Sequence, residues 1–198
     1  MKYQLLRSDE YRLMRWKNGL GVTCEIRREP ADESEAIVWR ASIADIKEKS
    51  SFSTFSGLAR IINTLEGGGM RLKVDGSWTG PLLKYDPFIF SGDSEVESEL
   101  LDGPIRDFNL IYDSRVCAAR LQWLEVSRPQ VFCSQAETIL IFSVGQVEVA
   151  IGDESFILNH HDSVLLDNDR AALTRISLSS RSAALESHCC LIEIACRA

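Results

Sequence analysis

Three strand-like runs in the first half of the chain place polar side chains on one face and apolar side chains on the other. Side chains two positions apart on a strand point the same way, so each run presents a pair of polar groups. If the strands are neighbours in a sheet, these pairs and one further arginine can form a single polar site. The residues are Thr23 and Glu25, Arg40 and Ser42, Asp107 and Asn109, and Arg60.

An arginine on such a face favours the binding of an anion. Its planar guanidinium presents a fork of N–H donors that matches a carboxylate group. If the polar faces point into a small barrel, each arginine must be paired, because an isolated buried charge is strongly destabilising. Glu25, Asp107 or an anionic ligand can supply that pairing. If the faces instead form the wet exterior of a sheet, no partner is needed, and the residue types alone leave both interpretations open.

The stretch RWKNGLG, Arg15–Gly21, comes directly before the first of these runs. Asn18-Gly19 is typical of a tight turn, because glycine tolerates a left-handed backbone. Trp16 and Lys17 precede this turn, and a lysine at such a position is by default solvated. The strand launched by the turn then carries Thr23.

Residues typical of catalytic or metal sites are scarce. His160, His161 and His188 all lie in the second half without H-x-H or E-x-x-H spacing, so we expect no metal cofactor. We interpret His160 and His161 as solvated turn histidines. No G-x-S-x-G elbow is present. The Gly67–Gly69 triplet lacks the Lys-Ser/Thr of a phosphate-binding loop, which indicates a hairpin turn.

Strands must position all of these residues, because period-two alternation recurs from end to end and helical patterns are scarce. Two regions also repeat one another: LARIINTLEGGGMRLKVDG followed by LLKYDPFIFSGD, and AETILIFSVGQVEVAIGD followed by SFILNHHDSVLLDND. This pattern predicts a mostly β chain with either two small β-barrels or one sandwich of paired halves, and it resembles the cupin fold, a jelly-roll barrel. We place an N-terminal barrel with the ligand pocket at residues 1–115 and a C-terminal barrel at 116–198, with strands exchangeable between the halves.

The composition is that of an ordinary globular protein, with 45% hydrophobic and 26% charged residues among 198. The formal net charge of −7, without a basic cluster, disfavours direct binding to nucleic acid. The charged start of the chain has no apolar signal segment, and no run is long enough to span a membrane. We therefore expect no membrane partner and a cytoplasmic location. Six cysteines without a C-x-x-C pair indicate reduced thiols, mostly small buried side chains.

Four segments closely resemble the HutD family, the accessory proteins of bacterial histidine-utilisation operons, which also includes the Ves proteins. The segments are RWKNGLGVTCEI, WRASIADI, FSTFSGLARIINTLEGGGMRL and RDFNLIYDS. The resemblance runs from about Leu13 to Ile194 and is most specific in the first half. It implies a bicupin fold without the usual metal histidines and a regulatory role in histidine catabolism. It also implies that a pathway acid such as urocanate or N-formylglutamate binds in the N-terminal barrel.

The ligand-binding residues expected from this resemblance extend the polar faces with aromatic and turn residues. We infer that Arg40 and Arg60 bind the carboxylate of the ligand and that Lys17 adds charge at the pocket mouth. Amide side chains would fix the orientation of the ligand, and aromatic rings would pack on its plane. The complete set is Trp16, Lys17, Asn18, Thr23, Glu25, Arg40, Arg60, Phe90, Asp107 and Asn109.

The predicted function is that of a non-enzymatic protein that binds a small carboxylate metabolite and modulates histidine utilisation, without catalytic residues or cofactors. The alternative is a metal-independent cupin enzyme acting on a histidine-pathway carboxylate, with Glu25 or Asp107 as general base. A third hypothesis is an interaction module that uses an edge strand near Ala118–Val126. The sequence leaves homo-oligomerisation open.

Overall fold

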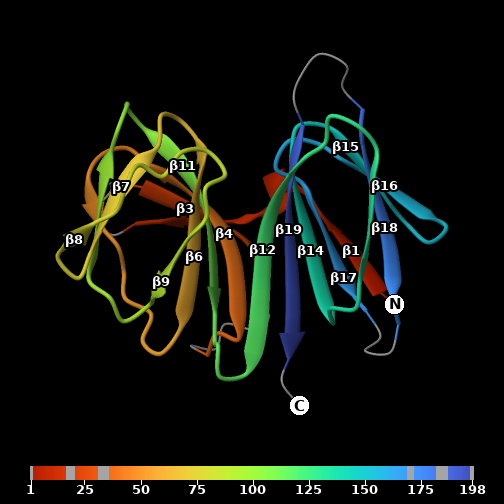
Figure 1. Ribbon diagram of the computed structural model, residues 1–198, viewed down its shortest axis with the longest axis horizontal. Coiled ribbons are helices and arrows are strands. Elements are labelled where there is room, and N and C mark those ends of the chain that lie inside the picture. The colour runs from red at the N-terminus through yellow and green to blue at the C-terminus, as the bar shows by residue number, and fades with distance from the viewer. Residues whose placement is uncertain (1, 17–20, 31–35, 169–171, 182–186, 197–198) are drawn as a thin grey trace. The chain divides into compact units, whose positions relative to one another are not determined.

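The computed structural model describes residues 2–16, 21–30, 36–168, 172–181 and 187–196, most of them in β-strands (Figure 1). A short 3-10 helix, η1 (Ser8–Glu10), is the one helical element of this described part. The chain divides into an N-terminal unit, Arg12–Val116, and a C-terminal unit that joins Met1–Tyr11 to Cys117–Ala198. The described residues hold no helix with the length and apolar character that crossing a bilayer requires. The expected mostly β fold is confirmed.

The N-terminal unit consists of two antiparallel sheets. The larger sheet has six strands in the order β2 (Arg12–Arg15), β3 (Gly21–Glu29), β4 (Trp39–Ile46), β11 (Ile105–Tyr112), β6 (Ala59–Glu66) and β9 (Phe88–Ser91). The smaller sheet has four strands in the order β5 (Ser50–Ser51), β10 (Val96–Leu100), β7 (Met70–Val74) and β8 (Ser77–Trp78). Apolar side chains from both sheets form one core, which shows that the sheets pack face to face; its buried members include Ile46, Ile62, Met70, Leu72, Val96 and Ile105.

The C-terminal unit repeats this two-sheet arrangement. Its five-stranded sheet has the order β1 (Lys2–Leu6), β17 (Ser163–Asp167), β14 (Thr138–Val144), β19 (His188–Cys196) and β12 (Cys117–Glu125). Its four-stranded sheet has the order β13 (Gln130–Ser134), β18 (Thr174–Ser180), β15 (Val147–Ile151) and β16 (Glu154–Leu158). Apolar side chains form the core between them, and its buried members include Ile139, Ile141, Val149, Leu166, Ile176 and Leu191.

The internal repeat corresponds to matching strands in the two units. The strands β6, β7, β8 and β9 follow one another as β14, β15, β16 and β17 do, and β11 lies beside β6 as β19 lies beside β14. The two copies of the repeat therefore form the same hairpins. The period-two pattern arises because alternate apolar residues of each strand face the core between the two sheets.

Strand β1 comes from the start of the chain but completes the C-terminal unit. It pairs antiparallel with β17, with Lys2 opposite Asp167 and Leu6 opposite Ser163, and Figure 1 shows the red strand beside its partner. Asp162 holds the segment that follows β1. Its Oδ1 accepts a hydrogen bond from the Ser8 N–H at 2.9 Å, and its Oδ2 lies 2.6 Å from Arg7 Nη1. This segment thus groups with the second half of the chain, although it precedes the first.

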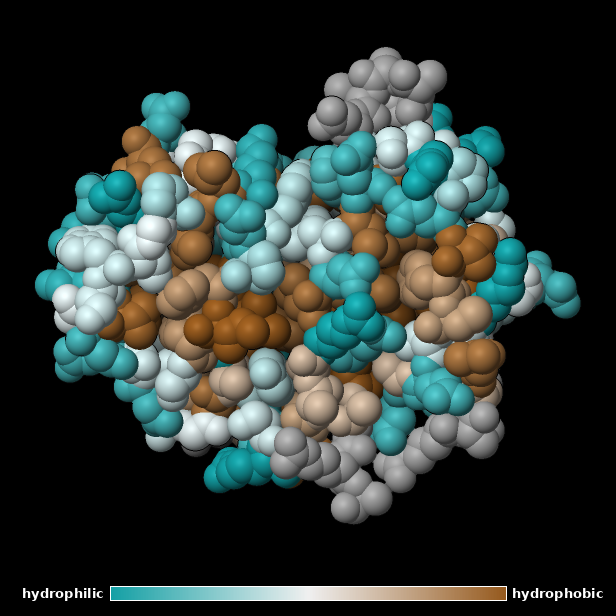
Figure 2. Space-filling model, in the orientation of Figure 1, coloured by the Kyte–Doolittle hydropathy of each residue, from teal (hydrophilic) through white to brown (hydrophobic). Residues whose placement is uncertain are grey.

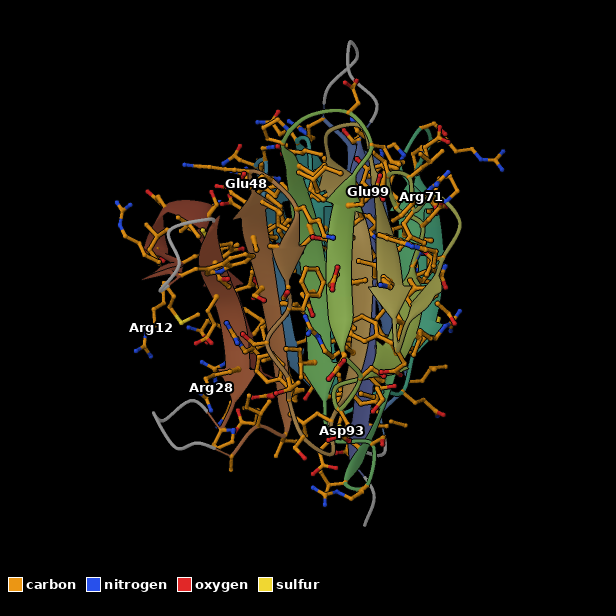
Figure 3. All side chains as sticks on the ribbon, turned by 90° about the vertical axis from the view of Figure 1, so that its left-hand side faces the viewer. Arg12, Arg28, Glu48, Arg71, Asp93 and Glu99 are labelled. Carbon is orange, nitrogen blue, oxygen red and sulfur yellow. The ribbon has the colours of Figure 1, made fainter. Side chains whose placement is uncertain are left out.

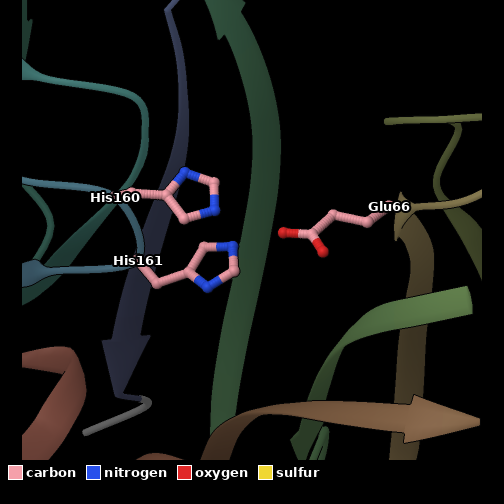
Figure 4. Close-up of side chains that lie close together, drawn as sticks. All are labelled: Glu66, His160 and His161. Carbon is pink, nitrogen blue, oxygen red and sulfur yellow. The ribbon is translucent and has the colours of Figure 1, made fainter.

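The adjacent histidines have different environments. The rings of His160 and His161 stack with centroids 3.8 Å apart (Figure 4), but His160 is exposed whereas His161 is only 5% exposed. The buried ring also stacks on Phe142 at 5.3 Å. The interpretation of both as solvated turn histidines is therefore wrong for His161, which packs as a core residue. Glu66, drawn in the same figure, belongs to the N-terminal unit, where it lies 3.7 Å from Arg106 Nη1.

The cysteines are mostly buried thiols. Cys117, Cys189 and Cys190 are buried, Cys24 is half-buried and Cys133 is exposed; all five are free. Burial raises the pKa of Cys189 to about 12, so this thiol stays protonated and behaves as a small apolar side chain. The side chain of Cys196 lies outside the described residues.

Large apolar side chains also reach the surface of the N-terminal unit. On the face drawn in Figure 2, brown hydrophobic atoms lie among teal hydrophilic ones. Scattered exposed apolar residues are normal on a soluble surface, and these are spread over several strands and loops. They are Leu13, Trp78, Leu83, Ile89, Leu101 and Val116.

Candidate ligand-binding site

A cavity of about 530 Å³ lies inside the N-terminal unit. It is lined by the six-stranded sheet on one side and by the segment around β5 on the other. The lining residues are Met14, Arg15, Trp16, Thr23, Arg40, Ser42, Ala44, Ser51, Phe52, Ser53, Phe55, Arg60, Asp107, Asn109 and Ile111. Polar and aromatic residues are thus the majority of those that line the cavity.

The strand register explains why the polar residues meet. Directly opposed residues in a sheet project from the same face. Across β4, β11 and β6, one row contains Arg40, Ile111 and Arg60, and the next contains Ser42, Asn109 and Ile62. A third row contains Ala44, Asp107 and Thr64, and a fourth begins the apolar core with Ile46 opposite Ile105. The inner face therefore changes from polar to apolar along the strands.

Arg60 is the most unusual residue of the cavity. It is 5% exposed, and its guanidinium carbon lies over the rings of Phe52, Phe55 and Phe90 at 5.2, 5.2 and 4.9 Å from their centroids. Nη1 donates to the Ser53 carbonyl at 3.0 Å, whereas the buried Nε has no hydrogen-bond partner. Within the described part of the chain, Arg60 forms no ion pair.

Burial lowers the pKa of Arg60 to about 10, which still leaves the guanidinium charged at neutral pH. The Asp107 carboxylate acts in the opposite direction, and Arg40 adds to the lowering. Aromatic faces partly compensate a desolvated cation through their quadrupoles. They do not neutralise it, so the cavity retains a positive centre.

Arg40 differs from Arg60 because it has a carboxylate partner. Its Nε lies 2.8 Å from Glu25 Oε2, and both side chains are largely buried. Burial lowers the pKa of Arg40, while Glu25 opposes that shift and Arg28 reinforces it. Of the alternatives left open by the sequence, Glu25 therefore pairs with Arg40 and not with Arg60.

Two acceptor groups stand in the cavity next to these cations. Asp107 is 2% exposed and Asn109 is 8% exposed, and the Oδ1 atoms of both lack hydrogen-bond partners. Burial raises the pKa of Asp107 to about 7; Arg60 and the backbone N–H of Ala44 limit the rise, and Asp45 adds to it. Asp107 can consequently exchange a proton near neutral pH.

Trp16 forms an aromatic wall that depends on a glycine. Its indole N–H donates to Thr23 Oγ1 at 2.8 Å. Gly21 lies against the indole ring, because a Cβ at this position would approach the ring carbons to 2.9 Å and the Asp45 carbonyl oxygen to 2.6 Å. Only glycine fits there without displacement of the ring or the neighbouring strand.

The structure gathers most of the expected ligand-binding residues. Trp16, Thr23, Arg40, Arg60, Asp107 and Asn109 line the cavity. Glu25 and Phe90 are adjacent to the lining through Arg40 and Arg60. Lys17 and Asn18 lie outside the described residues.

Sequence reasoning missed the Phe52–Phe55 segment. Phe52, Ser53 and Phe55 lie between β5 and β6 and supply two of the three rings around Arg60 and the carbonyl that it binds. A signal was present in FSTFSG, where two phenylalanines three positions apart stand in a serine-rich loop before an arginine. Met14, Arg15 and Ser51 also line the cavity without having been singled out.

The C-terminal unit has apolar residues at four of the equivalent positions. Matching pairs across the central strands place Ile139 where the N-terminal unit has Arg60, and Leu166 where it has Phe90. Cys189 and Leu191 occupy the places of Asp107 and Asn109. These four residues belong to the apolar core of that unit. The same fold can therefore form without a buried arginine, carboxyl or amide at these places, so Arg60, Asp107 and Asn109 are not a requirement of the architecture.

Other arginines of the N-terminal unit lie away from the cavity. Figure 3 shows Arg12 and Arg28 at the β2 and β3 edge of the larger sheet, whereas Arg71 lies at the opposite side of the unit. Arg71 is exposed on β7, opposite Glu99 of β10. Arg71 therefore serves as the exposed control residue for the buried Arg60.

Two such units of packed antiparallel sheets define a cupin-class protein with an arginine-containing cavity in its first unit. The bacterial pirin YhhW of Escherichia coli, 12% identical, covers 97% of this chain and 98% of its own with a TM-score of 0.64, which shows the fold alone. The chain belongs to the HutD family, whose model matches residues 8–185. The expected family and bicupin fold are thereby confirmed.

Similar proteins come from Pseudomonas. A protein of Pseudomonas putida named as an uncharacterized 21.2 kDa protein in the hutC 3′ region is 48% identical, over 84% of this chain and 87% of its own length. HutD from Pseudomonas fluorescens SBW25, solved in a formate condition, is 43% identical with a TM-score of 0.85 over the full length of both chains. A conserved protein of unknown function from Pseudomonas aeruginosa PAO1 is 41% identical with a TM-score of 0.92, over 98% of this chain and 100% of its own.

Proposed function

We propose that the protein binds a small organic acid in the cavity of its N-terminal unit and thereby modulates histidine utilisation without catalysing a reaction. The observation that carries this proposal is Arg60, a buried cation with a free Nε and no carboxylate partner among the described residues. Burying a charge without its counter-ion is destabilising, and a ligand carboxylate would supply that counter-ion.

The cavity suits a planar or extended acid of metabolite size. A volume of about 530 Å³ lies within the usual range for small-molecule sites. Trp16, Phe52 and Phe55 provide apolar surfaces for the body of the ligand. Urocanate and N-formylglutamate are the candidates, because the chain belongs to the HutD family and a relative is named after the hutC region.

An effect on gene expression would pass through the ligand. The net charge of −7 disfavours contact with a phosphate backbone. A binding protein can instead lower the free concentration of an inducing metabolite. Under this proposal the cellular response depends on the amount of protein and on its affinity for the acid.

Isothermal titration calorimetry tests the proposal with urocanate and N-formylglutamate as separate titrants. Wild type should give saturable heat with at least one of them. Arg60→Met keeps an apolar stem among the phenylalanines without the charge and should bind at least about 10-fold more weakly. Arg60→Lys keeps the charge but lacks the planar guanidinium, so its affinity should lie between those of wild type and Arg60→Met.

The matched control is Arg71→Met, which removes an exposed arginine from the same unit and should leave affinity unchanged. Absence of heat and of a thermal shift with both acids at millimolar concentration would refute the proposal. Equal binding by Arg60→Met and wild type would also refute it.

A metal-independent enzyme acting on the same acids is the second candidate, and Asp107 is the observation that favours it. A buried carboxyl with a pKa of about 7 beside an arginine has the properties of a general base. Glu25 is less suited to that role because it is bound to Arg40. Product analysis after incubation decides between the two: more than one product molecule per protein, lost in Asp107→Asn, would establish an enzyme.

A further inference from the structure

The cavity contains acceptors that a carboxylate alone cannot satisfy. Asp107 Oδ1 and Asn109 Oδ1 are both buried without a hydrogen-bond partner, and both residues line the cavity. A carboxylate brings further acceptors and no donor, so it could bind the free Arg60 Nε but would leave these two oxygens unpaired. A ligand that satisfies all of these polar groups must therefore contain both a hydrogen-bond acceptor and a hydrogen-bond donor.

The positions of these groups along the sheet define an axis. Asn109 and Asp107 are two residues apart on β11 and share one face, so their Cα atoms are separated by roughly 7 Å. Arg60 lies opposite Ile111, one row further from Asp107 than Asn109 is. The backbone positions of Arg60 and Asp107 are thus two rows apart on the polar face, with Asn109 in the row between them.

From this arrangement we propose that the site selects organic acids that also carry an N–H donor several bonds from the carboxylate, such as an N-acyl amino acid or an azole-substituted acid. The inference rests on the proposed function and specifies its ligand class. Arg60 binds the anionic end, and Asp107 Oδ1 accepts the N–H, with Asn109 Oδ1 as the neighbouring acceptor.

Two physical reasons make the N–H a selecting group. A ligand that excludes water without donating to Asp107 leaves a buried acceptor unsatisfied, and such mismatches are penalised more strongly than a missing apolar contact. The second reason is electrostatic. Asp107 in its ionised form repels an added anion at short range, and an N–H directed at its oxygen opposes that repulsion.

The test uses ligand pairs that differ at the N–H alone. Urocanate is compared with 3-(furan-3-yl)acrylate, which has the same planar shape and carboxylate but no N–H. N-formylglutamate is compared with the formate ester of 2-hydroxyglutarate, in which oxygen replaces the N–H. Titration calorimetry at a pH above 7.5 should give an affinity at least about 10-fold higher for the N–H member of a binding pair.

Asp107→Leu, an apolar near-isostere, identifies the acceptor. It should reduce the affinity ratio within the pair toward one, mainly by weakening the N–H compound, and thermal unfolding checks that the variant is folded. Asn109→Leu provides the second variant and should reduce the same ratio to a smaller extent. General damage to the cavity would lower both affinities and leave their ratio unchanged.

The outcomes separate the two proposals. If both members of a pair bind equally to wild type, the N–H selection is refuted while the proposed acid-binding function stands. If the ratio persists in both Asp107→Leu and Asn109→Leu, the assignment of these acceptors is refuted. If neither N–H compound binds at millimolar concentration, the proposed function fails and the selection with it.

Discussion

Tyr85 and His161 adopt the same left-handed backbone conformation, with φ of 67° and 68°, at matching turns of the two units. The Tyr85 N–H donates to the Thr64 carbonyl of β6 at 2.9 Å, and the His161 N–H donates to the Ser143 carbonyl of β14 at 2.8 Å. Positive φ is uncommon for residues other than glycine, so its occurrence at both places marks a turn that the fold requires. The repeat in the sequence thus extends to single backbone angles.

An aspartate follows each of these residues and stabilises its turn: Asp86 after Tyr85 and Asp162 after His161. The two should contribute differently to the free energy of unfolding. Among the described residues, Asp86 accepts one side-chain hydrogen bond, from the Leu83 N–H at 3.2 Å. Asp162 is buried and accepts from Asn159, Ser8 and Arg7. We expect Asp162→Ala to lower the free energy of unfolding by about 2–4 kcal/mol and Asp86→Ala by at most about 1 kcal/mol, measured by urea denaturation.

The pH dependence gives a further check on Asp162. Burial raises its pKa, but the hydrogen bonds from Ser8, Asn159 and Arg7 outweigh burial, and the net shift is downward. Its stabilising contribution is therefore present above the ordinary pKa of 3.8 and is lost as pH falls through the lower folded-state pKa. Equal losses of stability for both alanine variants at neutral pH would contradict this account.

Asp107→Asn should change how stability depends on pH. The folded-state pKa of about 7 lies above the ordinary 3.8, so the folded state favours the protonated carboxyl, and stability declines as pH rises from about 4 to 7. Asp107→Asn has no ionisable group at this position, so this decline of stability with pH is absent from the variant. The difference in unfolding free energy, variant minus wild type, should become more positive by about 2–4 kcal/mol over that interval. A constant difference between pH 4 and 8 would contradict the raised pKa.

Arg60→Met should not destabilise the protein, even though it removes a buried, ordered side chain. The guanidinium is desolvated without an ion-pair partner in the described chain, and its contacts with three phenylalanines offset only part of that cost. We expect the free energy of unfolding to stay equal or to rise by about 1–3 kcal/mol in chemical denaturation. A loss above about 2 kcal/mol would mean that the aromatic and Ser53 contacts exceed the desolvation cost.

Gly21→Ala should displace Trp16. The added Cβ would lie 2.9 Å from the indole and 2.6 Å from the Asp45 carbonyl oxygen. Overpacking of this kind costs about 1–3 kcal/mol, and the indole wall of the cavity would move with the ring. Thermal unfolding measures the loss of stability, and calorimetric titration with the ligand acids measures the effect on binding. Gly80→Ala is the control, because its Cβ would meet nothing within 4 Å; an equal effect of both substitutions would rule out the close-contact explanation.

The sequence is most informative where strands alternate regularly. Alternation in β3, β4 and β11 predicts which residues share a face, and adjacent strands then bring Arg40, Asp107 and Asn109 to one side. Alternation cannot choose between the interior and the exterior for a polar face, since either satisfies the pattern. The structure settles this by placing the polar rows on the inner face of the sheet.

Features that depend on tertiary packing escape such reasoning. Phe52 and Phe55 stand in a loop without periodicity, and only the folded chain brings their rings over Arg60. His161 follows an exposed residue in a polar turn, so its burial against Phe142 depends on the path of the backbone at positive φ. Strand β1 carries no local sign that its partner is β17.

The route of β1 has a consequence for biosynthesis. Ser8 and its anchor Asp162 are 154 positions apart, so the start of the chain leaves the ribosome long before the sheet that it will join exists. The unit from Arg12 to Val116 contains all of its own strands and can form in the meantime. The five-stranded sheet of the C-terminal unit can be completed only after Ser163–Asp167 has been synthesised, because this strand is the partner of Lys2–Leu6. Its completion therefore follows the synthesis of the whole N-terminal unit.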